Sequence, residues 1–173
     1  MAADVSQLTI VHYPAPVLRA KAKPIGRITE KVRSLAERML QLMHEAPGVG
    51  LAAPQVGVSW RMFVANPTGD PADDQVFINP VLTEPSREMH DRDEGCLSLP
   101  DITAQIRRPK AITITATGLD GREFSLSSDE LAARIWQHEI DHLDGVLIID
   151  RMTPMDRLAN ARKLKELEKG MTR

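Results

Sequence analysis

The chain has 173 residues, 42% of them hydrophobic and 27% charged, and its 22 basic and 24 acidic side chains give a formal net charge of −2. This length and composition predict a single folded domain, residues 1–173, and not a disordered chain. The charge balance excludes nucleic-acid binding by bulk charge, the single cysteine excludes an internal disulfide, and no apolar run approaches the roughly 18–20 residues of a membrane span.

The chain begins MAADVSQLTI, which lacks a basic region followed by an apolar run, so we expect no secretory signal and a cytoplasmic protein. Residues 1–27 contain several prolines and Gly26, which predict an extended arm broken by turns. A helix is expected after Thr29, a residue type that caps helix N-termini, and Pro47-Gly48 ends it. Its apolar residues recur at helical spacing: Val32, Leu35, Met39, Leu40 and Met43.

Four β-like segments follow, at 61–65, 76–79, 111–117 and 123–127. Asp120-Gly121 between the last two is a hairpin signal. A second helix is predicted from Ser127 or Ser128 to Gly145, then a short apolar strand at 146–149. Thr153 and Pro154 open a third helix. The order of helix, several strands, helix, short strand and helix predicts an α+β fold.

The strongest chemical signal is the segment His138-Glu139-Ile140-Asp141-His142 in the second helix. Residues four apart lie on the same face of a helix, so the two imidazoles can bind one metal ion. Glu139 lies beside that face, where its carboxylate can act as a general base toward water. The alternative is a pair of histidines on a solvated helix face.

A catalytic metal needs a third protein ligand and an open position. Glu166 and Glu168 follow at a spacing that a protease would allow, but both lie in the charged segment KLKELEK, which predicts a solvated helix. Cys96 is the better candidate, because thiolate suits a late first-row metal and because it follows a glycine in a polar loop, DRDEGC. The alternative is a buried, inert thiol.

The segment Gly48-Val49-Gly50-Leu51-Ala52-Ala53-Pro54-Gln55 is rich in small residues. It is either a helix stop followed by a loop, or a loop that another backbone approaches closely. In the second case Gln55 is an amide donor aimed into the site. The segment lacks the Lys-Ser/Thr ending of a phosphate-binding loop.

Taken together, these clusters resemble the peptide deformylase family, which is marked by GxGxAAxQ, EGCxS and HExDH in this order. Here they stand as GVGLAAPQ at 48–55, EGCLS at 94–98 and HEIDH at 138–142. The similarity extends to PAPVLR near the start, IRRP at 106–109 and DGVL after the second helix. The C-terminal helix resembles that of bacterial and organellar members.

The resemblance implies an α+β fold in which a central HExxH helix packs among antiparallel β-sheets, with N-terminal and C-terminal helices. It implies hydrolysis of the formyl group from the N-terminal formyl-methionine of newly synthesised polypeptides. It further implies metal ligation by Cys96, His138 and His142, natively of Fe(II), with Zn, Ni or Co as substitutes.

The family pattern also assigns roles to other residues. Glu139 is implied as general base and acid, and Gln55 and the backbone N–H of Leu97 as donors to the developing oxyanion. Gly50 and Gly95 would lie beside the substrate backbone, and Glu94 would pair with Arg108. We expect the methionine side chain to be held by apolar walls, with Val49, Leu131 and Ile135 as candidates.

Two positions depart from the family pattern near the substrate entrance. Thr103 stands where several bacterial members have arginine, and Arg92 stands where an apolar residue can line the methionine pocket. Both affect the expected side-chain preference and not the chemistry. We interpret His12, His44 and His90 as ordinary surface or packing residues.

Two other functions remain open at this point. One is a zinc endopeptidase of the HExxH type, which would need a cleft open on both sides. The other is a non-catalytic, metal-stabilised module that binds the ribosome. Residues 154–173 carry six basic and three acidic side chains, so transient ribosome contact through the C-terminal helix is one interpretation and a solvated helix the other. We expect a monomer.

Overall fold

The computed structural model describes residues 4–170, so the first three residues of the N-terminal segment and Arg173 of the basic tail lie outside it. Its helices are α1 (Glu30–Glu45), α2 (Leu131–Leu143), α3 (Ile148–Arg151) and α4 (Pro154–Gly170). Its strands are β1 (Gly50–Ala52), β2 (Met62–Ala65), β3 (Gln75–Thr83), β4 (Met89–Cys96), β5 (Leu99–Pro109), β6 (Ile112–Thr117) and β7 (Glu123–Ser128). No helix in this part of the chain combines the length and apolar character needed to cross a bilayer.

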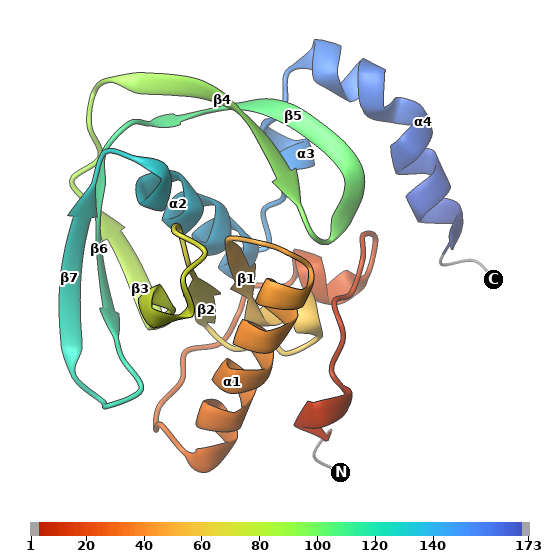
Figure 1. Cartoon of the computed structure of the whole chain (residues 1–173). Coiled ribbons are helices and arrows are strands. Elements are labelled where there is room, and N and C mark those ends of the chain that lie inside the picture. Colours follow the sequence, from red (N-terminus) through yellow and green to blue (C-terminus); the bar gives the residue numbers. More distant parts are fainter. Residues whose placement is uncertain (1–3, 171–173) are drawn as a thin grey trace.

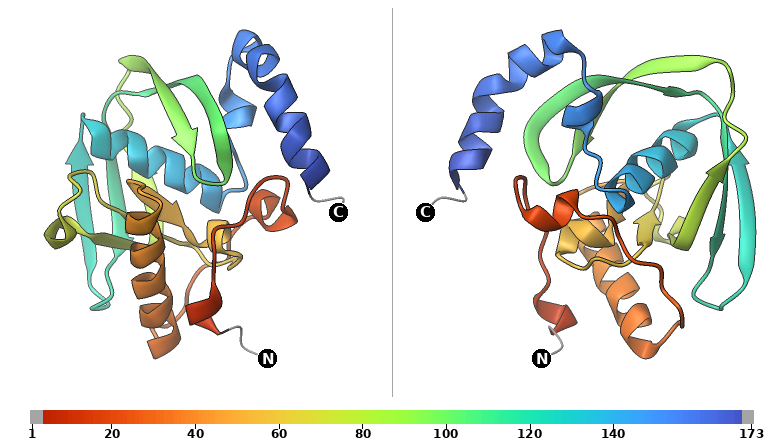
Figure 2. Two further views of the ribbon diagram at one scale, coloured as in Figure 1. Left: turned by 45° about the vertical axis from the view of Figure 1, so that its right-hand side comes forward. Right: turned by 180° about the vertical axis from the view of Figure 1, so that it is seen from behind.

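The strands form two antiparallel sheets with α2 between them. Five strands pair in the order β1-β2-β3-β6-β7, and β4 pairs with β5 in a long separate hairpin. The hairpin arches over α2, while α1 lies beside β1 and β2 and α4 runs along the outside of the hairpin (Figures 1 and 2). The predicted α+β fold, with the HExxH helix among antiparallel sheets, is confirmed.

Three apolar clusters hold these layers together. The first joins the inner face of the large sheet to α2, where Phe63 stacks on Phe77 with ring centroids 4.5 Å apart and Trp136 packs against Phe77. The second packs α1 against β1, β2 and β3. The third lies under the β4–β5 hairpin, where Ile102 and Ile106 meet α3 and α4. The first cluster therefore holds the helix that carries both histidines against the large sheet.

The first helix and the 111–128 hairpin form as predicted. Helix α1 begins at Glu30, directly after Thr29, although the threonine side chain makes no capping hydrogen bond. The turn between β6 and β7 has Gly121 at a φ of +80°, and the Asp120 carboxylate accepts a hydrogen bond from the N–H of Arg122. Strand β3 is longer than the predicted 76–79.

The start of the second helix was placed too early. Ser127 and Ser128 belong to β7, and α2 begins at Leu131 after Glu130. Ser128 still acts locally, since its Oγ accepts the Glu130 N–H at 3.1 Å. The predicted end is right, because Gly145, at a φ of +75°, follows Asp144, the residue that caps the C-terminus of the helix.

Three predictions for short segments were wrong. The apolar run 146–149 enters helix α3 instead of forming a strand, because the Asp150 carboxylate accepts the Leu147 N–H at 2.8 Å and starts a helical turn. The segment DRDEGC is strand β4 and not a loop, and residues 50–52 of the small-residue segment form strand β1. In β4 the charges are tolerated because the partner strand and α2 supply counter-charges to Glu94.

Candidate active site

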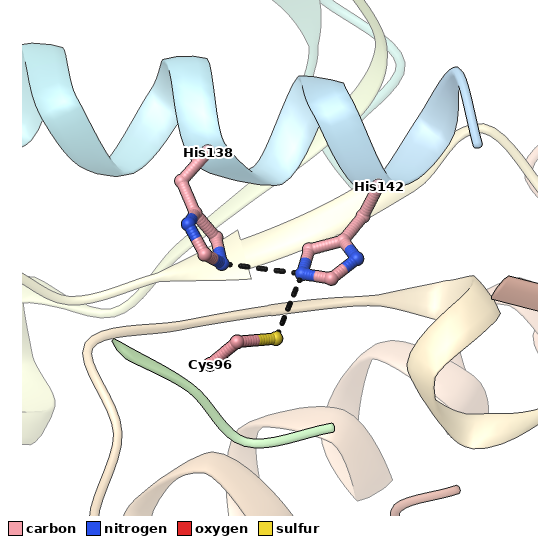
Figure 3. Close-up of side chains that lie close together, drawn as sticks. All are labelled: Cys96, His138 and His142. Carbon is pink, nitrogen blue, oxygen red and sulfur yellow. Dashed lines mark hydrogen bonds between the residues drawn. The ribbon is translucent and has the colours of Figure 1, made fainter. Parts of the chain in front are cut away.

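The two histidines of α2 and the cysteine at the end of β4 converge on one point. His138 and His142 project from the same face of the helix, and their Nε2 atoms face each other at 3.1 Å (Figure 3). The Sγ atom of Cys96 lies 3.3 Å from Nε2 of His142. Cys96 reaches this point because it stands at the tip of the hairpin, where β4 turns into β5.

These three atoms fit a metal ion. They lie within 4.8 Å of one another, in a group found among the described residues. Two imidazole nitrogens on one tetrahedral ion are about 3.3 Å apart, because each lies about 2.0–2.1 Å from the ion. The observed spacing is close to that value. A thiolate with two imidazoles suits a late first-row metal and leaves a fourth position open.

The two rings differ in how readily each one takes a proton. Burial opposes charge on His138, yet hydrogen bonds with Cys96 and Glu94 raise the pKa of His138 well above its ordinary value. Burial and the neighbouring His138 lower the pKa of His142 well below its ordinary value. The site thus accepts one positive charge at the meeting point of the rings but not two protons.

A buried carboxylate orients His138 from behind. Nδ1 of His138 lies 2.9 Å from Oε1 of Glu94, which directs Nε2 toward Cys96. Arg108 binds both oxygens of Glu94 in a bidentate pair, at 2.7 and 2.9 Å, so the predicted pairing is found. Burial alone would raise the pKa of Glu94, but the hydrogen bonds from Arg108 and His138 outweigh it and hold the pKa well below the ordinary value. Glu94 is therefore a permanent anion.

Glu139 lies next to this centre, and its carboxylate is able to accept a proton. Its side chain is buried, and within residues 4–170 its Oε2 atom has no hydrogen-bond partner. Burial raises the pKa of Glu139 to about 7, with the attraction of His138 opposing and the repulsion of Glu94 adding to the effect. A carboxylate with this pKa can both accept and return a proton near neutrality.

Gln55 is held so that its amide nitrogen faces the same point. Its Oε1 atom accepts the N–H of Ala52 at 2.9 Å, which fixes the amide plane. Its Nε2 atom lies 3.2 Å from Oγ of Ser98 and 3.6 Å from Sγ of Cys96. Leu97 lies between Cys96 and Ser98 in the turn, so its backbone N–H belongs to the same wall.

The predicted substrate residues line one pocket of about 680 Å³. Gly50 and Ile135 are buried in its wall, whereas Val49 and Leu131 are each 46% exposed and Gly95 is also exposed at its surface. The lining shared with the candidate centre includes Gln55, Cys96, Leu97, His138 and Glu139. The pocket thus joins apolar side chains to the candidate metal ligands.

Of the two departures from the family pattern, one reaches the pocket. Thr103 lines it, but Arg92 is exposed and lies outside the lining, so the expectation for Arg92 was wrong. Arg92 precedes Cys96 by four residues in β4, so at about 3.3 Å per residue it lies roughly 13 Å from Cys96 along the strand. Glu166 and Glu168 lie on α4, where they contact Arg162 and Tyr13 and not the pocket.

Several residues around the site were not predicted from the sequence. Arg134 and Asp141 join the charge network of Glu94 and Arg108, and His12 lines the pocket although we interpreted it as an ordinary residue. The sequence position of Arg134 could have indicated its role, because Arg134 precedes His138 by about one helical turn and so lies on the same face of the helix. His44 and His90 form hydrogen bonds with Asp74 and Glu88 away from the pocket.

Comparisons with known proteins agree with this arrangement. A model of the polypeptide deformylase family matches residues 7–158. Peptide deformylase from Acidobacterium capsulatum is 41% identical over 163 residues, covering 93% of this chain and 95% of that protein. Peptide deformylase 1B, chloroplastic/mitochondrial, from Arabidopsis thaliana is 43% identical over 164 residues, or 94% of this chain, which spans only 60% of that plant protein.

Solved structures give the same result. A crystal structure of plant peptide deformylase PDF1B is 42% identical, with a TM-score of 0.91, and the match covers 95% of this chain and 91% of that one. The peptide deformylase from Plasmodium falciparum is 34% identical with a TM-score of 0.92, over 95% of this chain and 97% of that one. The chain belongs to the peptide deformylase family of metal-dependent enzymes, which remove the formyl group from new polypeptides.

Proposed function

We propose that this chain acts as one catalytic domain that hydrolyses the formyl amide of N-formyl-methionyl polypeptides. The observation that carries the proposal is the meeting of Cys96, His138 and His142 beside one pocket, which Cys96, His138 and Glu139 line. In this assignment those three residues hold one divalent ion. A protease would use a more distant glutamate as third ligand, and both candidates lie on α4, where Glu166 contacts Arg162 and Glu168 contacts Tyr13.

The mechanism follows from the positions of the side chains. A divalent ion bound there supplies Lewis acidity, which polarises water and the formyl carbonyl. Glu139 takes the proton of the attacking water at Oε2, the oxygen without a partner among the described residues, and then donates it to the departing amine nitrogen. Nε2 of Gln55 and the N–H of Leu97 donate hydrogen bonds to the oxyanion that develops on the formyl oxygen.

Substrate selection follows from the pocket walls. The glycines at 50 and 95 let the substrate backbone approach, and Val49, Leu131 and Ile135 offer apolar contact to the methionine side chain. A formyl carbon carries only hydrogen, so a narrow wall admits it and crowds an acetyl group. One methylene in an apolar pocket is worth roughly 1–3 kcal/mol, so preference among apolar first residues is modest.

We assign Fe(II) as the native ion, with Zn, Ni and Co as functional substitutes. The donor set of one thiolate and two imidazoles accepts any of these ions, and geometry and availability select among them. Metal analysis of protein purified without oxygen, paired with activity of the same sample, identifies the ion. Active protein that, as purified without oxygen, carries zinc and no iron would contradict the assignment of iron as the native ion.

Three further assignments concern the cellular setting. We place the protein in the cytoplasm as a monomer, where formylated chains leave the ribosome. The exposed side chains Arg157, Arg162, Lys163, Lys165 and Lys169 of α4 support transient contact with ribosomal RNA. The names of two plant relatives, from Arabidopsis thaliana and Oryza sativa, place those proteins in chloroplasts or mitochondria, which is a property of those proteins.

One preparation assayed on three substrates tests the proposed activity. We expect rapid formate release from formyl-Met-Ala-Ser and almost no reaction with the acetylated peptide or with casein. The difference in rate between formyl and acetyl peptides should far exceed the difference between peptides with two apolar first residues. The reason is that a rigid pocket wall clashes with the acetyl methyl group. Similar rates on the formyl and acetyl peptides, or cleavage of casein, would favour a broader hydrolase.

A further inference from the structure

Arg134 ties the helix of the candidate metal centre to both strands of the hairpin. Its side chain is only 12% exposed. Nη1 donates to Oε2 of Glu94 at 2.6 Å and to the carbonyl of Ile106 at 3.1 Å, and Nη2 donates to the carbonyl of His90 at 2.9 Å. Arg134 therefore fixes α2 against β4 and β5 at once, without touching the candidate metal ligands.

The carboxylate of Glu94 needs this second arginine. Arg108 is shared, because its Nη1 donates to Asp141 at 2.9 Å while its other donors bind Glu94. The buried carboxylate of Glu94 and the partly buried carboxylate of Asp141 thus share one guanidinium. Arg151 provides the additional charge for Asp141, at 2.6 and 2.7 Å, and Arg134 provides it for Glu94.

The carboxylate of Glu94 orients the ring of His138 but not the ring of His142. Oε1 of Glu94 lies 2.9 Å from Nδ1 of His138. Nδ1 of His142, by contrast, is buried without a hydrogen-bond partner within residues 4–170, so packing orients that ring. A shift of Glu94 would therefore rotate one ring of the pair and leave the other in place.

We propose that Arg134 is a positioning residue for the metal centre, holding Glu94 so that the His138 ring keeps Nε2 directed at the ion. This inference rests on the ligand set given under the proposed function. Residues that orient a metal ligand from behind change metal affinity or activity by about 10–100-fold when they are removed. Arg134 should belong to this class although it carries no ligand atom.

The test measures metal binding directly, without the reaction. Metal-free protein is titrated with Zn²⁺ against a competing chelator, and with Co²⁺ to record the visible absorption of the bound ion. Arg134→Met, which keeps an apolar stem, should weaken Zn²⁺ binding by at least about tenfold and alter the Co²⁺ spectrum. Arg134→Lys, with one donor group in place of a fork, should restore part of the affinity.

Arg151→Met is the matched control, because it removes an arginine from the same network without touching Glu94. It should leave Zn²⁺ affinity within about twofold of the unmodified protein. Equal affinity in folded Arg134→Met, or an equal loss in the control, would overturn the proposal. Failure of both Arg134 variants to fold would make the residue purely structural and would overturn it too. An unmodified protein that binds no metal would instead overturn the proposed function.

Discussion

At the scale of single residues, the position of Glu139 depends on the absence of a side chain opposite it. A Cβ built on Gly50 would lie 2.5 Å from Oε1 of Glu139 and 3.0 Å from Cγ2 of Ile135. Helix α2 resists displacement there, because its apolar face is packed against the large sheet. The glycine in the segment GVGLAAPQ is therefore required by the carboxylate as well as by the substrate.

Replacing Gly50 by alanine should displace the Glu139 carboxylate. A misplacement of about 1 Å in a reacting group costs on the order of 10²-fold in rate, and we expect a loss of kcat of that size. Gly26→Ala serves as the control, because a Cβ there meets no atom within 4 Å. Unchanged kcat in Gly50→Ala would show that Glu139 has room to move.

Glu139 itself should be separable from metal binding, because it lies beside the ligands and is not needed as one. Glu139→Ala should keep the metal and the fold but lower turnover by at least about 10²-fold, the usual scale of general acid–base catalysis. Metal content by elemental analysis and formate release on one sample make the comparison. Loss of the metal from this variant would mean that Glu139 is structural.

At the scale of elements, how well each segment could be predicted depends on where its determinants lie. Helix α1 and the β6–β7 hairpin carry their own patterns, a stripe of apolar residues and an Asp-Gly turn, and both were predicted. The β4 strand was not, because its charged residues suit a strand only when Arg108 and Arg134 neutralise Glu94. Those partners are distant in sequence, so no local pattern reveals them.

Helix α3 likewise depends on a partner that is distant in sequence, because Arg19 binds Asp150. The contribution of Asp150 to stability can be tested by varying the pH. Burial of Asp150 opposes its ionisation, but hydrogen bonds from Arg19 and the Leu147 N–H outweigh it and lower the pKa of Asp150. A carboxyl group with a lowered pKa in the folded state stabilises the protein above its unfolded pKa of about 3.9, and this contribution is lost as the pH falls further.

Asp150→Asn should therefore lower Tm at pH 7, and the difference from the unmodified protein should shrink as the pH falls below about 4. Arg162→Gln, which breaks the exposed pair with Glu166 on α4, is a control in which little change is expected. A difference in Tm between Asp150→Asn and the unmodified protein that stays constant from pH 7 to pH 3 would rule out the ionic origin.

At the scale of the whole molecule, distant parts of the chain meet at one pocket. The segment at 48–55 lies against α2, and the tip of the β4–β5 hairpin brings Cys96 to the two histidines. Motif spacing predicted which residues would meet, since each motif carries its own chemistry. Motif spacing could not predict the contacts of Arg134 or the exposed position of Arg92, because both depend on how the hairpin crosses α2.

We propose that one ion, held by Cys96, His138 and His142, is required for removal of the formyl group. The most direct measurement is an oxygen-free titration of metal-free protein with Fe(II), following formate release from formyl-Met-Ala-Ser at each step. We predict activity that rises linearly and saturates at about one equivalent, and almost none in Cys96→Ser, because a neutral hydroxyl replaces a thiolate poorly as a ligand. Full activity in metal-free protein, or an unchanged titration in Cys96→Ser, would contradict the account.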